Sequence, residues 1–277
     1  MKKSIKILLN SLGNLLHKVL NLPILVFISD SFLTAKVNNK SSIKVDGETI
    51  YFATPNFLNR YRHKTFFTKE PETLKWIDNF EKKDIFYDIG ANVGLYSIYA
   101  AKKRKVKVYC FEPSFFNLEF LARNIYMNSL FDDIFIFPIA LNENISVSKF
   151  RLTSTEWGGA LSTFDKNFDD SGNKINSNFI YNTVGFDIDN LTELTKIPYP
   201  DHIKIDVDGL EHIILLGAQK VIKRAKTVLI EINDNFTEQK SLSEKLMLDA
   251  GFKVVNKVHT ESLKQPTFNQ FWINTQV

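Results

Sequence analysis

From about residue 80 onward, short apolar runs rich in Val, Ile and Phe alternate with segments of helical periodicity. This alternation is typical of βαβ units, and it predicts an α/β fold with a mostly parallel sheet. We expect strands over Ile85–Asp88, Val106–Glu112, Ile134–Ala140, His202–Val207, Thr227–Ile232, Lys253–Lys257 and Phe271–Asn274. Helices are expected between them, over Val93–Lys103, Phe115–Asn128, Leu210–Arg224 and Ser241–Ala250.

Residues 142–200 interrupt this alternation between the third and fourth predicted strands. They contain two β-like pieces, Ser146–Leu152 and Phe179–Phe186, and a polar tract over residues 165–178 that is typical of a surface loop. Connections of this length inside a compact domain are usually functional or disordered. The sequence therefore predicts a domain over residues 80–277 that carries an insertion at 142–200.

Residues 1–79 precede this pattern and lack its regularity, which indicates an N-terminal cap. Apolar residues at helical spacing predict an amphipathic helix over residues 4–20 that ends before Pro23. Polar residues interrupt the apolar run, so it is too short to span a membrane and differs from a signal peptide. Its lysines leave two interpretations open: packing on the same domain or on a second copy of the chain, or contact with a membrane surface.

Charge and cysteine content exclude some classes of protein. The chain has 35 Lys and Arg against 31 Asp and Glu, and a net charge of +4 does not indicate a nucleic-acid binder. Its single cysteine, Cys110, excludes an internal disulfide and a multi-cysteine metal site. Such sparing use of cysteine is typical of a reducing compartment, so we expect a cytoplasmic protein.

The stretch Asp88-Ile-Gly-Ala-Asn-Val-Gly94 joins the first predicted strand to the following helix. Glycines let the backbone approach a ligand closely, although the spacing matches neither a dinucleotide site nor a phosphate loop. Asp88 can accept hydrogen bonds from an ammonium group, and Glu112, at the end of the second strand, is placed for the hydroxyls of a ribose. An amino acid joined to a nucleoside fits both acids, which points to S-adenosylmethionine.

Three motifs together resemble the FkbM family of S-adenosylmethionine-dependent methyltransferases. The first is the stretch Asp88–Gly94, which we call the glycine turn. The second is Phe111-Glu-Pro113 with Asn117 and Asn124 in the next helix, and the third is Ile203-Lys-Ile-Asp-Val-Asp-Gly-Leu-Glu211. The resemblance runs from about Arg60 to Val277, and Lys69-Glu-Pro-Glu-Thr73 is similar to a lead-in found in part of the family. It implies a Rossmann-like, class I methyltransferase sheet of seven strands, with the last strand antiparallel. It also implies O-methylation of a hydroxyl, commonly on a sugar or a polyketide.

The resemblance also assigns the cofactor residues. It implies that Asp88, Gly90, Asn92 and Gly94 line the methionine end, that Glu112 binds the ribose, and that Ala140 and Leu141 lie at the adenine edge. Asn117 and Asn124 fit either a cofactor role or capping and packing, and we place Asn117 with the cofactor.

Carboxylates gather at the ends of the fourth and fifth predicted strands, where ligands of open α/β sheets bind. The candidate catalytic residues are Asp206, Asp208, Glu211 and Glu231, although Asp208 stands where many relatives have glutamate. We expect Asp206 to lie nearest the reacting hydroxyl, with a pKa raised by its neighbours so that it can act as a base. A Mg²⁺ ion held by these acids is the alternative, although no histidine joins them.

The acceptor is expected to be a small molecule or a glycan. Trp157-Gly158-Gly159 and the polar tract over residues 165–178 are predicted to cover it, because an aromatic ring beside flexible glycines suits a sugar. Trp157 as a plain core residue is the other interpretation. Two rival functions remain: a nicotinamide-dependent oxidoreductase, disfavoured by the missing third glycine, and a non-catalytic binding module.

Overall fold

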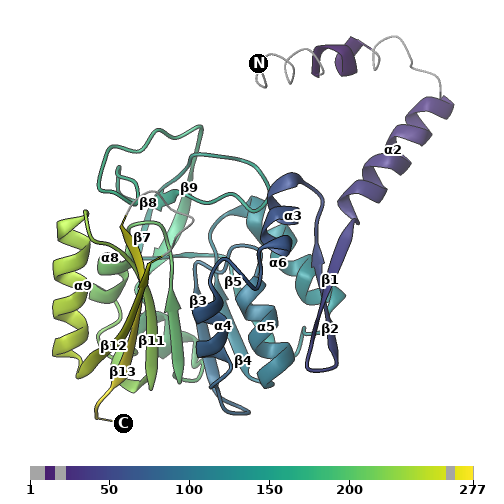
Figure 1. The fold of residues 1–277 in the computed structure, drawn as a ribbon. Coiled ribbons are helices and arrows are strands. Elements are labelled where there is room, and N and C mark those ends of the chain that lie inside the picture. Colours follow the sequence, from purple (N-terminus) through teal and green to yellow (C-terminus); the bar gives the residue numbers. More distant parts are fainter. Residues whose placement is uncertain (1–9, 16–22, 260–265, 277) are drawn as a thin grey trace.

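The computed structural model describes residues 10–15, 23–259 and 266–276. Its centre is a seven-stranded sheet in the order β12-β13-β11-β10-β3-β4-β5 (Figure 1). The strands from β11 to β5 pair in parallel, and β13 is antiparallel to both of its neighbours. The predicted sheet with an antiparallel last strand is therefore confirmed. Its strands are β3 (Ile85–Ile89), β4 (Lys107–Phe111), β5 (Ile134–Phe137), β10 (His202–Ile205), β11 (Thr227–Asn233), β12 (Phe252–His259) and β13 (Thr267–Asn274).

Helices cover both faces of this sheet. Side chains alternate along β3, so that Phe86 packs with one helical layer and Tyr87 with the other. The layer on the Phe86 face contains α4 (Pro71–Ile77), α5 (Leu95–Arg104) and α6 (Phe115–Met127). The opposite layer contains α7 (Ile188–Thr195), α8 (Glu211–Leu216) and α9 (Thr237–Asp249). Burial on both faces explains why the central strands are continuous apolar runs.

Two predicted elements end earlier than expected. The third predicted strand stops at Phe137, because Ala140–Leu141 (β6) pairs with the insertion instead of with β4. The helix expected over Leu210–Arg224 breaks into α8 and a 3₁₀ turn at Ile222–Arg224. Gly217 ends α8, and a side chain there would come within 2.3 Å of the carbonyl of Asn142.

Together with β6, the insertion forms a second sheet of four strands, in the order β6-β9-β7-β8. Both β-like pieces are confirmed as β7 (Ser146–Leu152) and β9 (Phe179–Phe186), which pair antiparallel, and β8 (Ser162–Phe164) is added at the edge. Residues 165–178 form a loop that contains one bridge, between Phe168 and Lys174. In Figure 1, β7, β8 and β9 lie at the upper end of the main sheet.

The N-terminal region is richer in structure than expected. Pro23 was predicted to follow a helix but begins α2 (Pro23–Val37), as a proline can at the first position of a helix. Of the predicted helix over residues 4–20, residues 10–15 are helical and the remainder lies outside the described residues. A hairpin follows, with β1 (Lys40–Val45) and β2 (Glu48–Ala53), and then α3 (Phe57–Lys64). No helix within the described ranges is both long and apolar enough to cross a membrane.

Asn124 has a packing role. Its Oδ1 accepts a hydrogen bond from the backbone N–H of Ala53 at 2.7 Å, and its Nδ2 donates to the carbonyl of Val93. The side chain therefore holds the hairpin against the turn that precedes α5. Of the two interpretations left open for Asn124, packing is the one that these contacts support.

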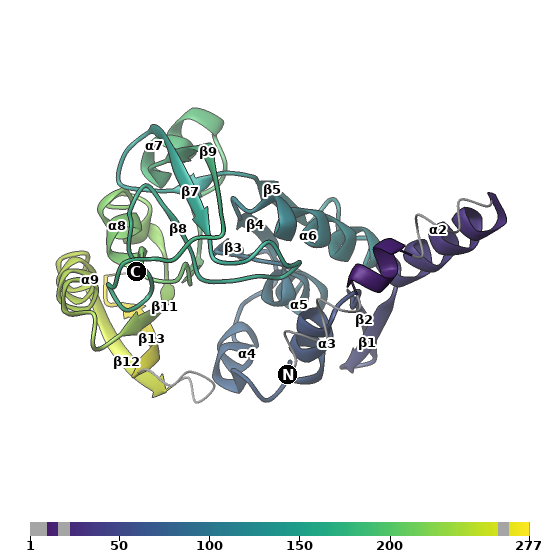
Figure 2. The ribbon, with the colours of Figure 1, turned by 90° about the horizontal axis from the view of Figure 1, so that it is seen from above.

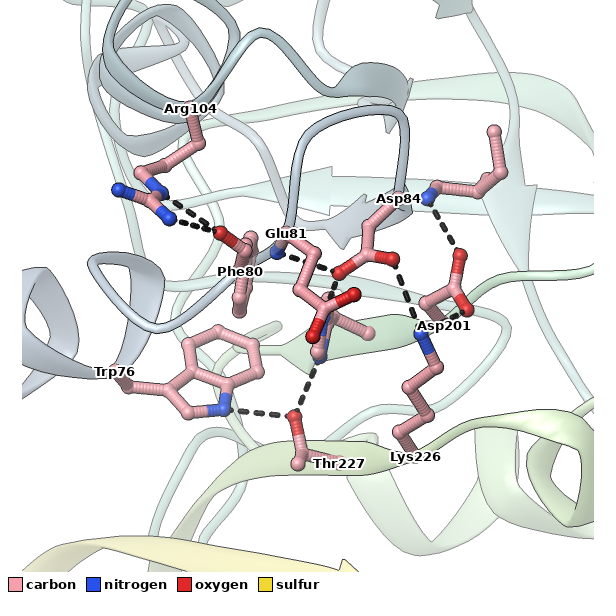
Figure 3. Close-up of polar contacts among 10 residues, drawn as sticks. Trp76, Phe80, Glu81, Asp84, Arg104, Asp201, Lys226 and Thr227 are labelled. Carbon is pink, nitrogen blue, oxygen red and sulfur yellow. Dashed lines mark hydrogen bonds and ion pairs between the residues drawn. The ribbon is translucent and has the colours of Figure 1, made fainter. Parts of the chain in front are cut away.

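A polar network lies at the end of the sheet where β3 and β10 begin (Figure 3). Asp84 accepts hydrogen bonds from His202 at 2.9 Å and from Lys226 at 3.0 Å. His202 also stacks on Phe80 at 3.8 Å and contacts the hydroxyl of Thr227. Burial outweighs the neighbouring carboxylate and lowers the pKa of His202. This histidine therefore ties strands together, at the opposite end of the sheet from the predicted ligand edge.

Candidate active site

A cavity of about 330 Å³ lies at the carboxyl ends of β3, β4, β10 and β11. This volume falls in the range of small-molecule sites. Residues far apart in the sequence line it. They come from the glycine turn after β3 (residues 88–94), the acidic turn after β10 (residues 206–209), and the segment between α3 and α4. The predicted ligand edge of the sheet is thus a real cavity.

The glycine turn brings backbone to backbone beneath this cavity. Gly90 has a φ of +82°, and a Cβ atom there would lie 1.9 Å from the carbonyl oxygen of Asp206. Gly94, at φ +80°, immediately precedes α5, and a Cβ there would meet Leu121 at 2.4 Å. No other residue fits at Gly90 without moving the acidic turn. The close contact between Gly90 and Asp206 therefore fixes the carboxyl ends of β3 and β10 against each other.

Asp88 lies at the end of β3, lines the cavity and is 1% exposed. One carboxylate oxygen accepts a hydrogen bond from the hydroxyl of Ser97. Burial raises the pKa of Asp88, and the charge of Lys204 partly opposes that rise. A buried carboxylate of this kind is a strong partner for a cationic group.

Glu112 stands at the tip of β4 and is held by the backbone. Its carboxylate accepts hydrogen bonds from the N–H of Asn92 at 2.9 Å and from the N–H of Ser114 at 2.7 Å. Burial nevertheless raises its pKa to about 7. Each carboxylate oxygen can accept further hydrogen bonds, so Glu112 can serve a pair of hydroxyls in the cavity.

Asn92 and Asn117 connect the cofactor side to the insertion. Both side chains donate to the carbonyl of Gly159, at 2.8 Å and 3.1 Å, and the N–H of Gly158 donates to Oδ1 of Asn117. They therefore hold this glycine loop over the cavity. Ala140 and Leu141 line the same cavity from β6.

The aromatic sugar platform expected at Trp157 is not formed. Its ring packs against Phe120 at 4.9 Å, and neither Trp157 nor Gly158 lines the cavity, whereas Gly159 does. The cause is α3, because the side chains of Asn56 and Asn59 donate to the carbonyl of Trp157 and draw it toward that helix.

The polar tract over residues 165–178 also lies apart from the cavity lining. Its backbone at Asp169 and Asp170 packs against Gly209, and Gly172 lies against Phe236. The tract therefore supports the acidic turn from behind, in contrast to the expected cover over the acceptor.

Asp206 forms an ion pair with Lys204 at 2.5 Å. Burial alone would raise the pKa of Asp206, but the charge and hydrogen bond of Lys204, together with the charge of Lys69, lower it. The expectation that neighbouring acids make Asp206 a stronger base is therefore wrong. Asp206 stays ionised at neutral pH and is a weak base.

Among the acids that line the cavity at the ends of β10 and β11, Glu231 and Asp208 have raised pKa values. Burial and the charge of Asp206 raise the pKa of Glu231 well above its usual range, and the Glu231 side chain in turn helps to lower the pKa of Asp206. Burial and the same charge raise the pKa of Asp208 to about 6. Asp208 accepts a hydrogen bond from the N–H of Leu161 at 2.6 Å, which links the acidic turn to the glycine loop.

Glu211 is separate from these three acids. It is 1% exposed, does not line the cavity, and accepts hydrogen bonds from the N–H groups of Val207 and Gly209 and from Gln239. Through these hydrogen bonds the Glu211 carboxylate fixes the conformation of the acidic turn. The catalytic role expected for Glu211 is therefore replaced by a positioning role.

Several residues from outside the predicted set also line the cavity: Arg62, Lys69, Glu70, Tyr96 and Lys204. Lys69 pairs with Glu70 at 2.8 Å, and burial and the charge of Glu70 raise the pKa of Tyr96. The lead-in motif at Lys69–Thr73 was the signal that could have found two of them. Within the described ranges, no cluster of three or more His, Cys, Asp or Glu side chains has the arrangement of a metal site.

Arg62 is the cation of this cavity that lacks a carboxylate partner in the part of the chain that the structure describes. One guanidinium nitrogen donates to the carbonyl of Gly158 at 2.6 Å, and its Nε is buried without a hydrogen-bond partner. An unmatched buried donor on a cation costs free energy unless a ligand pairs with it. Arg62 is therefore poised for an anionic group.

The family model that matches this chain and one relative found by sequence both point to methyl transfer. Residues 88–254 match a family model described as the methyltransferase FkbM domain. Over 206 residues the chain is 21% identical to the hexuronic acid methyltransferase AglP of Haloferax volcanii, a match that covers 72% of this chain and 77% of that protein. Similar solved structures include precorrin-6y C5,15-methyltransferase from Geobacter metallireducens, at 15% identity and a TM-score of 0.44, over 74% of this chain and 87% of that one. Fibrillarin from Aeropyrum pernix, solved with S-adenosyl-L-methionine, is similar at 12% identity and a TM-score of 0.48, over 86% and 84% of the two chains.

Proposed function

We propose a reaction for this chain, which belongs to the FkbM family of methyltransferases: transfer of a methyl group from S-adenosylmethionine to a hydroxyl of a sugar or glycan. One observation carries the proposal. A single cavity joins the glycine turn and Glu112 to the acidic turn at Asp206 and Asp208. Family membership as a methyltransferase also removes the reason to retain an oxidoreductase or a non-catalytic module.

The residues present fit this cofactor. Asp88 would accept from its ammonium group, Glu112 would accept from its ribose hydroxyls, and Ala140 and Leu141 would border its adenine. The buried, raised-pKa carboxylate of Glu112 supports this assignment, because hydroxyl donors would offset its cost of burial. When bound, S-adenosylmethionine supplies an electrophilic methyl group on a positively charged sulfur.

The protein's main task in this reaction is alignment of the acceptor oxygen with the methyl carbon, which can be worth several orders of magnitude in rate. Asp206, fixed by Lys204 and Glu231, would orient the acceptor hydroxyl. Asp208 would remove the hydroxyl proton, because its pKa of about 6 lies closest to neutral pH among the ionised acids of this turn. A base that has released its proton at neutral pH is ready for each turnover.

The acceptor is proposed to be an acidic sugar. The relative in Haloferax volcanii is named a hexuronic acid methyltransferase, and Arg62 offers this chain a guanidinium at the cavity that has no carboxylate partner among the described residues and a buried Nε without a hydrogen-bond partner. Arginine suits the planar carboxylate of a uronic acid because it can donate two parallel hydrogen bonds. A neutral sugar would leave the charge of Arg62 unmatched.

Arg62→Gln is expected to raise the KM for a uronic-acid acceptor by about tenfold or more, since a charged hydrogen bond is worth roughly 1.5–3 kcal/mol. The Kd for S-adenosylmethionine should change by less than about twofold. Lys64→Gln removes an exposed cation from the same helix and serves as the matched control. A tenfold rise in the cofactor Kd would instead assign Arg62 to the carboxylate of the cofactor.

The reaction itself is tested with methyl-labelled S-adenosylmethionine and a panel of neutral hexosides, uronic acids and non-sugar alcohols. We expect calorimetric titration to detect the cofactor but not NAD, and label to enter the uronic acids. Release of the label by mild base would indicate a methyl ester on the carboxylate, whereas an ether on a hydroxyl is stable. Cofactor binding with label only in non-sugar alcohols would overturn the sugar assignment.

A further inference from the structure

The described helices near the N-terminus expose an unusual amount of apolar surface. In Figure 1, α2 projects away from the two sheets and their covering helices, and Figure 2 shows the same separation from above. Seven large apolar side chains on α2 and on residues 10–15 are between 39% and 72% exposed, whereas Val37 at the end of α2 is partly buried against the core. The seven are Leu12, Leu15, Val26, Phe27, Ile28, Phe32 and Leu33. Exposed apolar surface of this kind marks a binding face.

The same stretch holds the charge excess of the chain. We refer to residues 1–37 as the N-terminal arm; it contains Lys2, Lys3, Lys6, Lys18 and Lys36 against the single acid Asp30. Its net charge of +4 equals that of the whole chain, so the remaining residues carry 30 basic and 30 acidic side chains. The sequence of the arm therefore combines an excess of lysines with the exposed apolar side chains described on α2 and on residues 10–15.

We propose that the N-terminal arm binds a membrane surface that carries anionic lipids. Apolar side chains that enter the headgroup region, beside lysines that attract anionic headgroups, are the combination that holds a peripheral helix on a bilayer. A second copy of the chain would match the apolar surface but would meet an equal positive charge. The proposal is independent of the acceptor assigned above.

The length and pattern of α2 agree with a position along the surface. Its 15 residues span about 22 Å, which is shorter than the roughly 30 Å hydrocarbon core of a bilayer. Val26, Phe27 and Ile28 are consecutive and each is exposed, so the apolar residues do not form the single stripe that a coiled coil requires. A lipid phase accepts apolar side chains without such a stripe.

The test is flotation of the full chain with vesicles of phosphatidylcholine alone or of equal parts phosphatidylcholine and phosphatidylglycerol. Partitioning onto the anionic vesicles should exceed that onto neutral ones by about tenfold or more, and it should fall with added salt. Equal binding to both vesicles, or binding to neither, would overturn the proposal.

Two sets of variants separate charge from apolar contact. Lys2, Lys3, Lys6 and Lys18 changed together to Gln should reduce partitioning by about tenfold or more. The matched control changes four exposed lysines that form no ion pair in the described structure, Lys44, Lys64, Lys82 and Lys253, and it should have little effect. Phe27→Ser with Phe32→Ser should also reduce partitioning, while cofactor titration stays unchanged. A dimer in light scattering that these two serines convert to a monomer, without vesicle binding, would assign the arm to a second copy instead.

Discussion

Asp208→Asn is expected to lower kcat by about 10²-fold or more while the Kd for S-adenosylmethionine stays nearly constant. Asparagine keeps the size of the side chain, and its carbonyl can still accept the hydrogen bond from the N–H of Leu161. What it removes is the proton acceptor. Thermal unfolding and cofactor titration of the variant check that the acidic turn is intact. A fully active Asp208→Asn enzyme would exclude Asp208 as the base.

The pH profile gives a second readout for the same assignment. A base must be deprotonated, so the wild-type kcat should be high above the pKa of Asp208, about 6, and should fall as the pH drops below it. The negative charge of Asp206 contributes to that raised pKa. Asp206→Asn should therefore move the inflection to lower pH as well as reduce kcat. An inflection that stays in place in Asp206→Asn would show that the profile reports another group.

A metal-assisted reaction predicts a different result from the same assay. If these acids held a divalent ion, EDTA would abolish turnover and Mg²⁺ would restore it. The proposed proton transfer to Asp208 predicts turnover that is insensitive to EDTA. This comparison separates the two roles that carboxylates at this position can have.

The elements of the main sheet could be predicted because their signals are local. Strands such as β3 and β10 are buried on both faces, so their apolar runs stand out against polar turns. The glycine turn was also readable, because Gly90 and Gly94 adopt positive φ angles that favour glycine. The break between Phe137 and Ala140 was not readable, since a local pattern does not reveal that β6 pairs with a different sheet.

The charges of the site are a long-range property and could be predicted only in part. The placement of Asp206 and Glu231 near each other follows from parallel neighbouring strands. The direction of the pKa shift of Asp206 depends on Lys204, two residues earlier in the chain, and on Lys69, which comes from a distant segment. The prediction that Trp157 covers the acceptor was wrong for a similar reason, because the hydrogen-bond partners of Trp157 at α3 are about a hundred residues away in the chain. The local pattern of an aromatic residue followed by glycines does not predict such distant partners.

Glu112→Ala is expected to weaken binding of S-adenosylmethionine by about 1.5–3 kcal/mol, or roughly ten- to a hundredfold in Kd. Alanine removes the acceptor for the ribose hydroxyls and also frees the N–H groups of Asn92 and Ser114. Glu112→Gln is the milder change, because its one carbonyl oxygen can still accept from one of the two backbone N–H groups while its amide nitrogen can accept neither the other N–H nor a hydroxyl. Glu119→Gln, an exposed acid on α6, is the matched control.

The pH dependence of the cofactor Kd then distinguishes a ribose contact from a merely structural one. The pKa of free Glu112 is about 7, and hydroxyl donors favour the charged carboxylate, so the wild-type Kd should rise as the pH falls below about 7. In Glu112→Gln this dependence should disappear, because no proton competes with the ribose at that position. A Kd for S-adenosylmethionine that is unchanged in Glu112→Ala would show that the ribose binds elsewhere. A Kd that is weakened in Glu112→Ala but normal in Glu112→Gln would leave Glu112 with the backbone role alone.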